Sequence, residues 1–418
     1  MTTRTGLARR GALVAKTVEL GTDVDLARVA GQHGVLWQKT GTGFAGRGVA
    51  ARVRVAPGRM GSAAAHVHEL LAAIDVDGPH PPVAVGALPF SASIEGELIV
   101  PELLVRRESD GTTSLTITGS DPRADVVAGA ARWRGEQSRV RDDVRPVEYT
   151  VRSVTDVRRW SEQVADAARS VAAGRLGKVV LAREVAVAAS RTIPVAEVLR
   201  RLGTAYPSCM VFAANGFVGA SPELLVARDG ERVRSQPLAG TAPRDGAAGS
   251  HLAAESSLMT SAKERHEHRL VVDAVGSTLA RLCRDLEVPE VPSLVPVGIV
   301  AHLGTAIEGR LAHPLPSALE VALALHPTPA VAGTPTELAL AHIAAVEGVD
   351  RGRYAGPVGW VDAAGDGEWA VGIRSAQLAG GNARLLAGAG IVAESVAEAE
   401  LVETELKLQA MLNAIVRP

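Results

Sequence analysis

The chain is poor in residues that would mark several classes of protein. Phe, Trp and Tyr make up 3% of its 418 residues, so Ala, Val and Leu must fill the core. Its two cysteines, Cys209 and Cys283, provide neither a disulfide framework nor a CxxC metal site, which fits a reducing compartment. No eighteen apolar residues run together, so no membrane span is expected. We therefore expect a cytoplasmic protein.

An excess of charge of either sign is also absent. The formal net charge is −2, which gives no electrostatic reason to expect nucleic acid or a membrane surface as a partner. The apolar run "GALVA" near the start is too short for a secretory signal. With 47% hydrophobic and 22% charged residues, the composition is that of a globular protein with ample material for a core.

Helical and strand-like segments alternate along the chain, which indicates a mixed α/β or α+β protein. A helix over 153–177 is capped by Thr155 or Asp156, and further helices are expected over 253–286 and 396–416. A Val-rich strand is expected over 178–189. Short strands separated by turns are expected over 209–240, and an Arg-rich surface connection over 132–150.

The stretch "SAKERHEHRLV", residues 261–271, has an unusual density of titratable groups. Glu264 and Glu267 are three apart and share one face of a helix. His266 and His268 are two apart and point roughly 200° away from each other, so they cannot chelate one zinc ion.

Glu400 and Glu403 repeat the spacing near the end of the chain. Taken alone, each pair is read as a solvated helix face. If the two faces met, four carboxylates would repel one another unless a hard cation such as Mg²⁺ lay among them.

The segment "LLAGAGIVAESVAEAEL" imitates a dinucleotide-binding motif. It reads as strand, G-x-G-x-x-A and helix, but no further strand with an acidic residue follows before Pro418. Gly388 and Gly390 are better interpreted as a tight turn, or as places where backbone N–H groups approach an anion.

Three further residues stand out from their surroundings. The local pattern predicts that Lys178 is an exposed residue at a strand start and that Glu223 is an ordinary edge carboxylate. Arg374 interrupts a strand-like run, so it needs a carboxylate partner if it points inward.

Ten blocks in order over residues 85–412 resemble the chorismate-utilising enzymes, isochorismate synthase in particular. The blocks are "GALPF", "LGKVVLARE", "GASPELLV", "QPLAGTAPR", "SAKERHEHRLV", "AHLGT", "ALHPTPAVAGTP", "RGRYAGPVGWVD", "GEWAVGIRSAQL" and "LLAGAGIVAESVAEAELVETELKL". The resemblance implies a two-lobed α/β (α+β) fold, an antiparallel β-sandwich flanked by helices with the site deep inside. The whole chain, 1–418, then forms one enzyme domain, with an N-terminal portion (1–145) and a catalytic chorismate-binding region (146–415).

The resemblance also assigns roles in the addition of water at carbon 2 of chorismate with loss of the carbon 4 hydroxyl. Lys178 matches the base and Glu223 the proton donor, which must be held protonated. Glu267 and Glu403 match the direct ligands of Mg²⁺, with Glu264 and Glu400 close by. The remaining matches are substrate contacts: Gly240, Thr241, His302, Tyr354, Arg374, Gly388, Gly390 and Lys407.

Within the family, Lys178 favours water as the nucleophile, because ammonia-using members lack this lysine and pair with a glutamine amidotransferase. Ala239 stands where aminodeoxychorismate synthases often have lysine, and Ala330 where pyruvate-eliminating members usually have Thr. We therefore expect a monomeric isochorismate synthase that serves menaquinone or siderophore synthesis and needs no amidotransferase. A salicylate synthase and a chorismate-binding protein without turnover remain as alternatives. Ser91, where many relatives have Asp, is the one departure noted.

Overall fold

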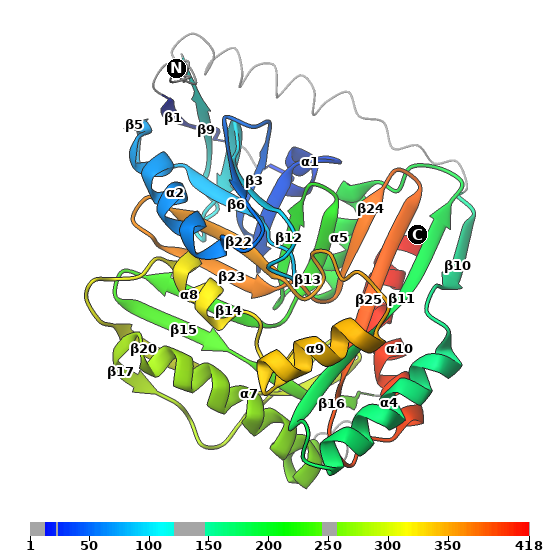
Figure 1. The fold of residues 1–418 in the computed structure, drawn as a ribbon. Coiled ribbons are helices and arrows are strands. Elements are labelled where there is room, and N and C mark those ends of the chain that lie inside the picture. Colours follow the sequence, from blue (N-terminus) through cyan, green and yellow to red (C-terminus); the bar gives the residue numbers. More distant parts are fainter. Residues whose placement is uncertain (1–12, 22–23, 121–146, 245–256, 418) are drawn as a thin grey trace, which may run out of the picture.

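Two large β-sheets dominate the computed structural model, which describes residues 13–21, 24–120, 147–244 and 257–417 (Figure 1). The first sheet contains, in spatial order, β10 (Tyr149–Ser153), β11 (Lys178–Ala189), β25 (Asn382–Ile391), β24 (Ser375–Ala379), β13 (Phe217–Ser221), β12 (Met210–Ala214), β2 (Val35–Lys39), β3 (Thr42–Arg47), β8 (Leu103–Arg107), β9 (Thr113–Gly119), β1 (Val14–Glu19) and β5 (Asp75–Asp77), with β21 (Gly333–Thr334) beside β11.

The second sheet is smaller, and a short third sheet accompanies it. The second contains β17 (Cys283–Glu287), β20 (Ile307–Leu311), β15 (Arg232–Gln236), β14 (Leu224–Asp229), β23 (Gly367–Val371), β22 (Pro357–Asp362), β6 (Val83–Ala87), β7 (Gly96–Val100) and β4 (Ala51–Val55). The third contains β16 (Leu238–Pro243), β19 (Val300–Gly304) and β18 (Ser293–Val297). β1 and β5 pair in parallel, and the other pairings in the described ranges are antiparallel.

The two large sheets face each other across a shared core. Trp37 on β2 donates its indole N–H to Glu368 on β23 at 2.8 Å, and Phe44 on β3 meets Trp360 on β22 edge-on, with ring centroids 5.8 Å apart. Strands from the N-terminal portion enter both sheets, because β2 pairs with β12 and β6 with β22. The predicted antiparallel sandwich is confirmed.

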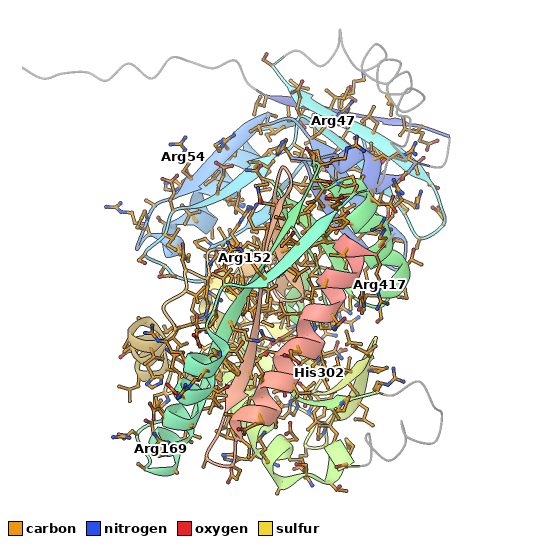
Figure 2. The ribbon with its side chains drawn as sticks, turned by 90° about the vertical axis from the view of Figure 1, so that its right-hand side faces the viewer. Arg47, Arg54, Arg152, Arg169, His302 and Arg417 are labelled. Carbon is orange, nitrogen blue, oxygen red and sulfur yellow. The ribbon has the colours of Figure 1, made fainter. Side chains whose placement is uncertain are left out.

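Helices cover the outer faces and the lower end of the sandwich (Figures 1 and 2). They are α1 (Leu26–Ala30), α2 (Met60–Ala72), α4 (Val157–Ala172), α5 (Val195–Ala205), α7 (Ala262–Ala280), α8 (Ala318–Leu325), α9 (Thr336–Val346) and α10 (Ala397–Val416). α10 lies along β25 with α4 and α5 beside it, whereas α2 and α8 cover the second sheet. In the described part of the chain, none of the helices combines the length and the apolar character needed to cross a membrane.

Local sequence explains where two of these helices begin. Asp156 caps α4 by accepting the backbone N–H of Arg159 at 2.9 Å, as the sequence predicted, and Ser261 caps α7 in the same way. The helix predicted over 253–286 is not continuous, because the backbone leaves the helix at Ser261 and α7 begins only at Ala262. The prediction is also too long at its C-terminal end. α7 ends at Ala280, because Cys283–Glu287 instead pairs as β17 with β20. The expected Arg-rich connection lies mostly outside the described residues.

Candidate active site

A pocket forms where β11, β25, the third sheet, α7 and α10 converge with the crossing from β13 to β14. Eleven of the predicted catalytic, metal-binding and substrate-binding residues line it: Glu223, Gly240, Thr241, Glu267, His302, Tyr354, Arg374, Gly388, Gly390, Glu403 and Lys407. Lys178, Glu264 and Glu400 lie behind this lining, each in contact with a neighbouring charged group.

Lys178 opens β11 and is 1% exposed. Its Nζ lies 2.8 Å from Oε1 of Glu267, which α7 brings against the strand. The expectation of an exposed lysine is therefore wrong, because the partner that buries it comes from a distant helix. Gly390 on the paired strand β25 makes this contact possible. A Cβ there would lie 2.1 Å from Oε1 of Glu267 and 2.7 Å from Cε of Lys178.

Glu223 lies in the crossing between the two large sheets and is 3% exposed, so it is not an ordinary edge carboxylate. Ser221 holds the crossing, because its hydroxyl donates to the Val371 carbonyl at 2.7 Å and accepts the Glu223 backbone N–H at 3.3 Å. Burial raises the pKa of Glu223 to about 8, although the nearby positive charge of Lys178 acts in the opposite direction. The carboxyl group is therefore mostly protonated at neutral pH, which is the state that a proton donor needs.

The glutamates of α7 and those of α10 lie near one another. Lys263 bridges the outer pair, with Nζ 2.9 Å from Oε1 of Glu400 and 3.5 Å from Oε1 of Glu264. Glu267 is 8% and Glu400 2% exposed, so the prediction that each pair alone forms a solvated face is wrong for these two residues.

Repulsion among these carboxylates appears in their pKa values. Burial raises the pKa of Glu264, and the charges of Glu267 and Glu403 raise it further. Burial and Glu403 likewise raise the pKa of Glu400. Burial also opposes ionisation of Glu267, but Lys178 and other lysines outweigh it and lower the pKa of this carboxyl group. A cation among the four groups would relieve this repulsion.

The four glutamates suit Mg²⁺ in chemistry, because they offer oxygen ligands only. As they stand, no three His, Cys, Asp or Glu side chains of the described residues lie close enough together to share an ion. Lys178, Lys263 and Lys407 contact the glutamates instead. The two histidines of α7 take no part, because His268 is buried against Thr305 at 2.7 Å while His266 is exposed.

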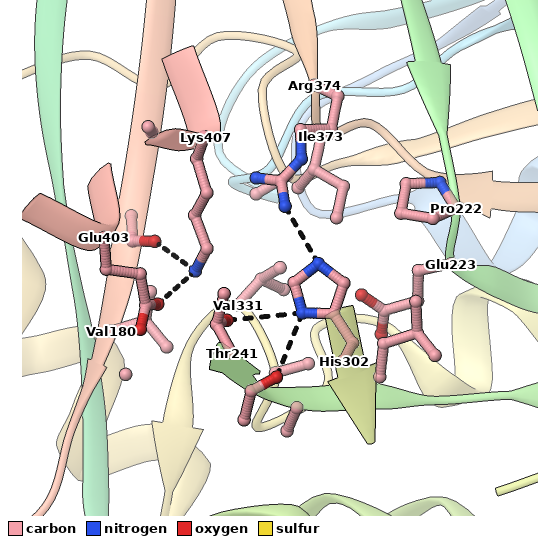
Figure 3. Close-up of a pocket in the computed structure, with 18 of the residues that line it drawn as sticks. Val180, Pro222, Glu223, Thr241, His302, Val331, Ile373, Arg374, Glu403 and Lys407 are labelled. Carbon is pink, nitrogen blue, oxygen red and sulfur yellow. Dashed lines mark hydrogen bonds and ion pairs between the residues drawn. The ribbon is translucent and has the colours of Figure 1, made fainter. Parts of the chain in front are cut away.

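Arg374 and His302 form a buried pair in the lining of the pocket (Figure 3). Burial, followed by the charges of Arg374 and Lys407, holds the pKa of His302 well below its ordinary value, so the ring is neutral. Its Nδ1 lies 3.0 Å from the Gly240 carbonyl and its Nε2 lies 2.9 Å from Nη2 of Arg374. We therefore assign the proton to Nδ1, so that Nε2 accepts from Arg374. The carboxylate partner expected for Arg374 is replaced by this imidazole.

Lys407 completes the wall formed by α10 and β25 (Figure 3). Its ammonium group donates to the Gly388 carbonyl at 2.9 Å and pairs with Glu403 one helical turn before it. Tyr354 is 7% exposed, and its hydroxyl lies 3.3 Å from where a Cβ on Gly388 would stand.

Comparisons with known proteins identify the family of this chain. Residues 24–416 match the family model described as chorismate binding enzyme. The protein belongs to this family. It is 37% identical to isochorismate synthase DhbC of Bacillus subtilis, over 85% of this chain and 86% of that protein. It is 42% identical to a putative isochorismate synthase MenF of Mycobacterium tuberculosis, over 80% and 86% of the two chains.

A solved structure extends the similarity to the fold of the family. The crystal structure of a putative 2,3-dihydroxybenzoate-specific isochorismate synthase, DhbC from Bacillus anthracis, superposes with a TM-score of 0.78 at 33% identity. The match covers 93% of this chain and 98% of that chain. The family predicted from the ten blocks is confirmed, and these relatives agree with the predicted enzyme type.

The pocket also has apolar lining that the sequence did not mark. Val180, Val331, Ala355, Ile373 and Leu386 face it. Each belongs to an apolar run, and which of its side chains face the pocket depends on strand register and loop path. No local signal in the sequence distinguishes them from core residues.

Proposed function

We propose that the protein is an isochorismate synthase, which converts chorismate to isochorismate. The observation that carries the proposal is the position of Glu223, which is 3% exposed and lines the pocket, with the buried amine of Lys178 behind the same lining. Burial raises the pKa of Glu223 to about 8. A protonated acid and a lysine within each other's electrostatic influence suit a reaction with one proton taken and one given.

In this mechanism Lys178 takes a proton from water as the water oxygen bonds to carbon 2. Glu223 gives its proton to the hydroxyl on carbon 4, which leaves as water while both ring double bonds shift by one position. The number of protons on substrate and product is the same. Both side chains are held by their surroundings, Lys178 by Glu267 and Glu223 by the Ser221 crossing.

The two carboxylates of chorismate require two binding regions. Arg374 and Tyr354 bind the enolpyruvyl carboxylate, and the neutral His302 orients Arg374 through Nε2. Gly240, Thr241, Gly388, Gly390 and Lys407 complete the substrate contacts. Glu267 and Glu403 would hold Mg²⁺ with Glu264 and Glu400 nearby, and the ion would supply positive charge to the ring carboxylate.

The reaction is proposed to stop at isochorismate. Ala330 lines the pocket and offers no hydroxyl near the enolpyruvyl arm, so pyruvate elimination, as in a salicylate synthase, has less support. Water as nucleophile requires no amidotransferase subunit, and we propose that the protein acts alone in the cytoplasm.

Purified protein incubated with chorismate and Mg²⁺ should give a mixture of chorismate and isochorismate. Chromatography with mass detection measures the two compounds. Addition of an isochorismatase should pull the mixture to completion. Glu223→Gln serves as the matched inactive control. Stoichiometric pyruvate and salicylate would reassign the protein to the salicylate synthases, and a product that requires ammonium would reassign it to the ammonia-using members. If chorismate binds but is not converted, the protein is a chorismate-binding protein without turnover.

A further inference from the structure

Among the described residues, no partner strand covers one edge of β11 over a short stretch beside the pocket. On this edge β21 pairs with Lys178 and Val179, and β10 pairs only from Val185 onward. The other edge pairs with β25 along almost the whole strand. The backbone groups between these two partners therefore need hydrogen bonds from elsewhere.

A buried ion pair fills this gap. Glu347 follows α9, and its Oε2 accepts the backbone N–H of Ala182 at 2.8 Å. Arg351 donates from Nη2 to the Val180 carbonyl at 2.9 Å. The pair itself is bidentate, with Arg351 Nε to Glu347 Oε1 at 2.7 Å and Nη2 to Oε2 at 2.6 Å. The Glu347 carboxylate as acceptor and the Arg351 guanidinium as donor thus make the two hydrogen bonds that a residue of a neighbouring strand would otherwise make.

Arg351 reaches two other parts of the pocket, one through its guanidinium group and one through its backbone. Nη1 donates to the Val331 carbonyl at 2.7 Å, next to Ala330. The Arg351 carbonyl accepts the backbone N–H of Tyr354 at 2.9 Å. The guanidinium lies 4.4 Å from the centre of the Phe90 ring, which belongs to the "GALPF" block. The side chains of Glu347 and Arg351 are 1% and 3% exposed, so water does not compete for these bonds.

We propose that Glu347 and Arg351 are positioning residues for the reaction, an inference that rests on the proposed function. They hold the start of β11, and with it Lys178, in register with the wall that carries Val331 and Tyr354. Neither side chain lines the pocket with the substrate-binding residues. Their effect acts through the backbone, and a displacement of about 1 Å at a reacting group can cost a hundredfold in rate.

The primary test is Arg351→Lys, which keeps the charge but cannot reach two carbonyls and two carboxylate oxygens from one ammonium group. We expect kcat to fall at least about tenfold, since base and acid lose alignment, with KM for chorismate changed by less than about threefold. Amide exchange over residues 178–184 should become faster. The matched control is Arg228→Lys, because Arg228 is 8% exposed and binds the carbonyls of Gly230 and Ala364 away from the pocket.

Glu347→Gln is the second variant, for the case that Arg351→Lys does not fold. It keeps an oxygen for the Ala182 amide but loses one bond to Arg351, so a smaller fall in kcat is expected. Wild-type kcat and exchange in a folded variant would overturn the inference, as would an equal loss of kcat in Arg228→Lys. If the wild-type protein does not convert chorismate, the proposed function fails instead, and the exchange measurement still tests the backbone contact.

Discussion

Replacing Glu223 with Gln should stabilise the protein while it abolishes turnover. In the unfolded chain this carboxyl group has its ordinary pKa of 4.5, whereas in the fold the value is about 8. Above pH 4.5 the unfolded state loses the proton that the folded state retains, so wild-type stability falls as pH rises, until the folded group also ionises near pH 8. At about 1.4 kcal/mol per pH unit, the 2.5 units between 4.5 and pH 7 amount to about 3 kcal/mol.

Gln is close in shape to the protonated acid and carries no charge in either state, so it avoids this cost. The backbone N–H of Leu238 donates to the carboxyl group in the wild-type protein, and in the Gln variant it can donate to the amide oxygen. The free energy of unfolding should be measured for both proteins by denaturant titration at pH 5, 6, 7 and 8. The advantage of Gln should be small near pH 5 and reach roughly 3 kcal/mol at pH 7.

The same pKa sets the pH dependence of the reaction. Glu223 must carry its proton to assist the departure of hydroxide, so kcat/KM should fall as pH rises above about 8. A difference in stability that does not change with pH, or a Gln variant less stable than wild type at pH 7, would refute the argument that burial keeps this acid protonated.

Three further substitutions test the rest of the site. Lys178→Ala should cut turnover by roughly a hundredfold or more while chorismate still binds, as isothermal calorimetry can check. Glu267→Gln should raise the Mg²⁺ concentration needed for half-maximal activity, and a chelator should abolish wild-type activity; full activity of this variant in limiting Mg²⁺ would contradict the ligand assignment. Gly390→Ala should lower kcat, because a Cβ would collide with Glu267 and Lys178, whereas Gly203→Ala, with no atom within 4 Å of its Cβ, should not. Equal effects of the two glycine variants would remove the steric explanation.

Sequence patterns located the elements that depend on local signals. The strand expected over 178–189 has these bounds in the structure, and the last helix differs from its expected range by one residue. α4 begins after Asp156, one of the two capping residues that the pattern offered, and it ends at Ala172, before the expected residue 177. Each of these elements has a clear start or an uninterrupted pattern within its own residues, which is sufficient to define it.

The features that the sequence did not predict depend on partners far away in the chain. The burial of Lys178 requires Glu267 on α7 and the absence of a side chain at Gly390. The role of Arg351 depends on a gap between two partner strands, which is visible only when the register of β11 is known. The block resemblance located the pocket residues because it carries this tertiary information.

Arg351 and Glu223 are both titratable groups buried in the fold, but the free-energy cost of burying them is offset in different ways. This difference separates their roles. Arg351 is stabilised by Glu347 and two carbonyls, so loss of its charge would leave a buried carboxylate unpaired and cost about 3–5 kcal/mol. Among the described residues, Glu223 forms no ion pair, and its burial is tolerable because it stays protonated. A neutral Gln at this position should therefore raise stability, whereas neutralising Arg351 should lower it. A residue whose neutral substitute stabilises the fold but stops the reaction is kept for its chemistry, and opposite signs at these two positions distinguish the proton donor from the residue that positions the strand.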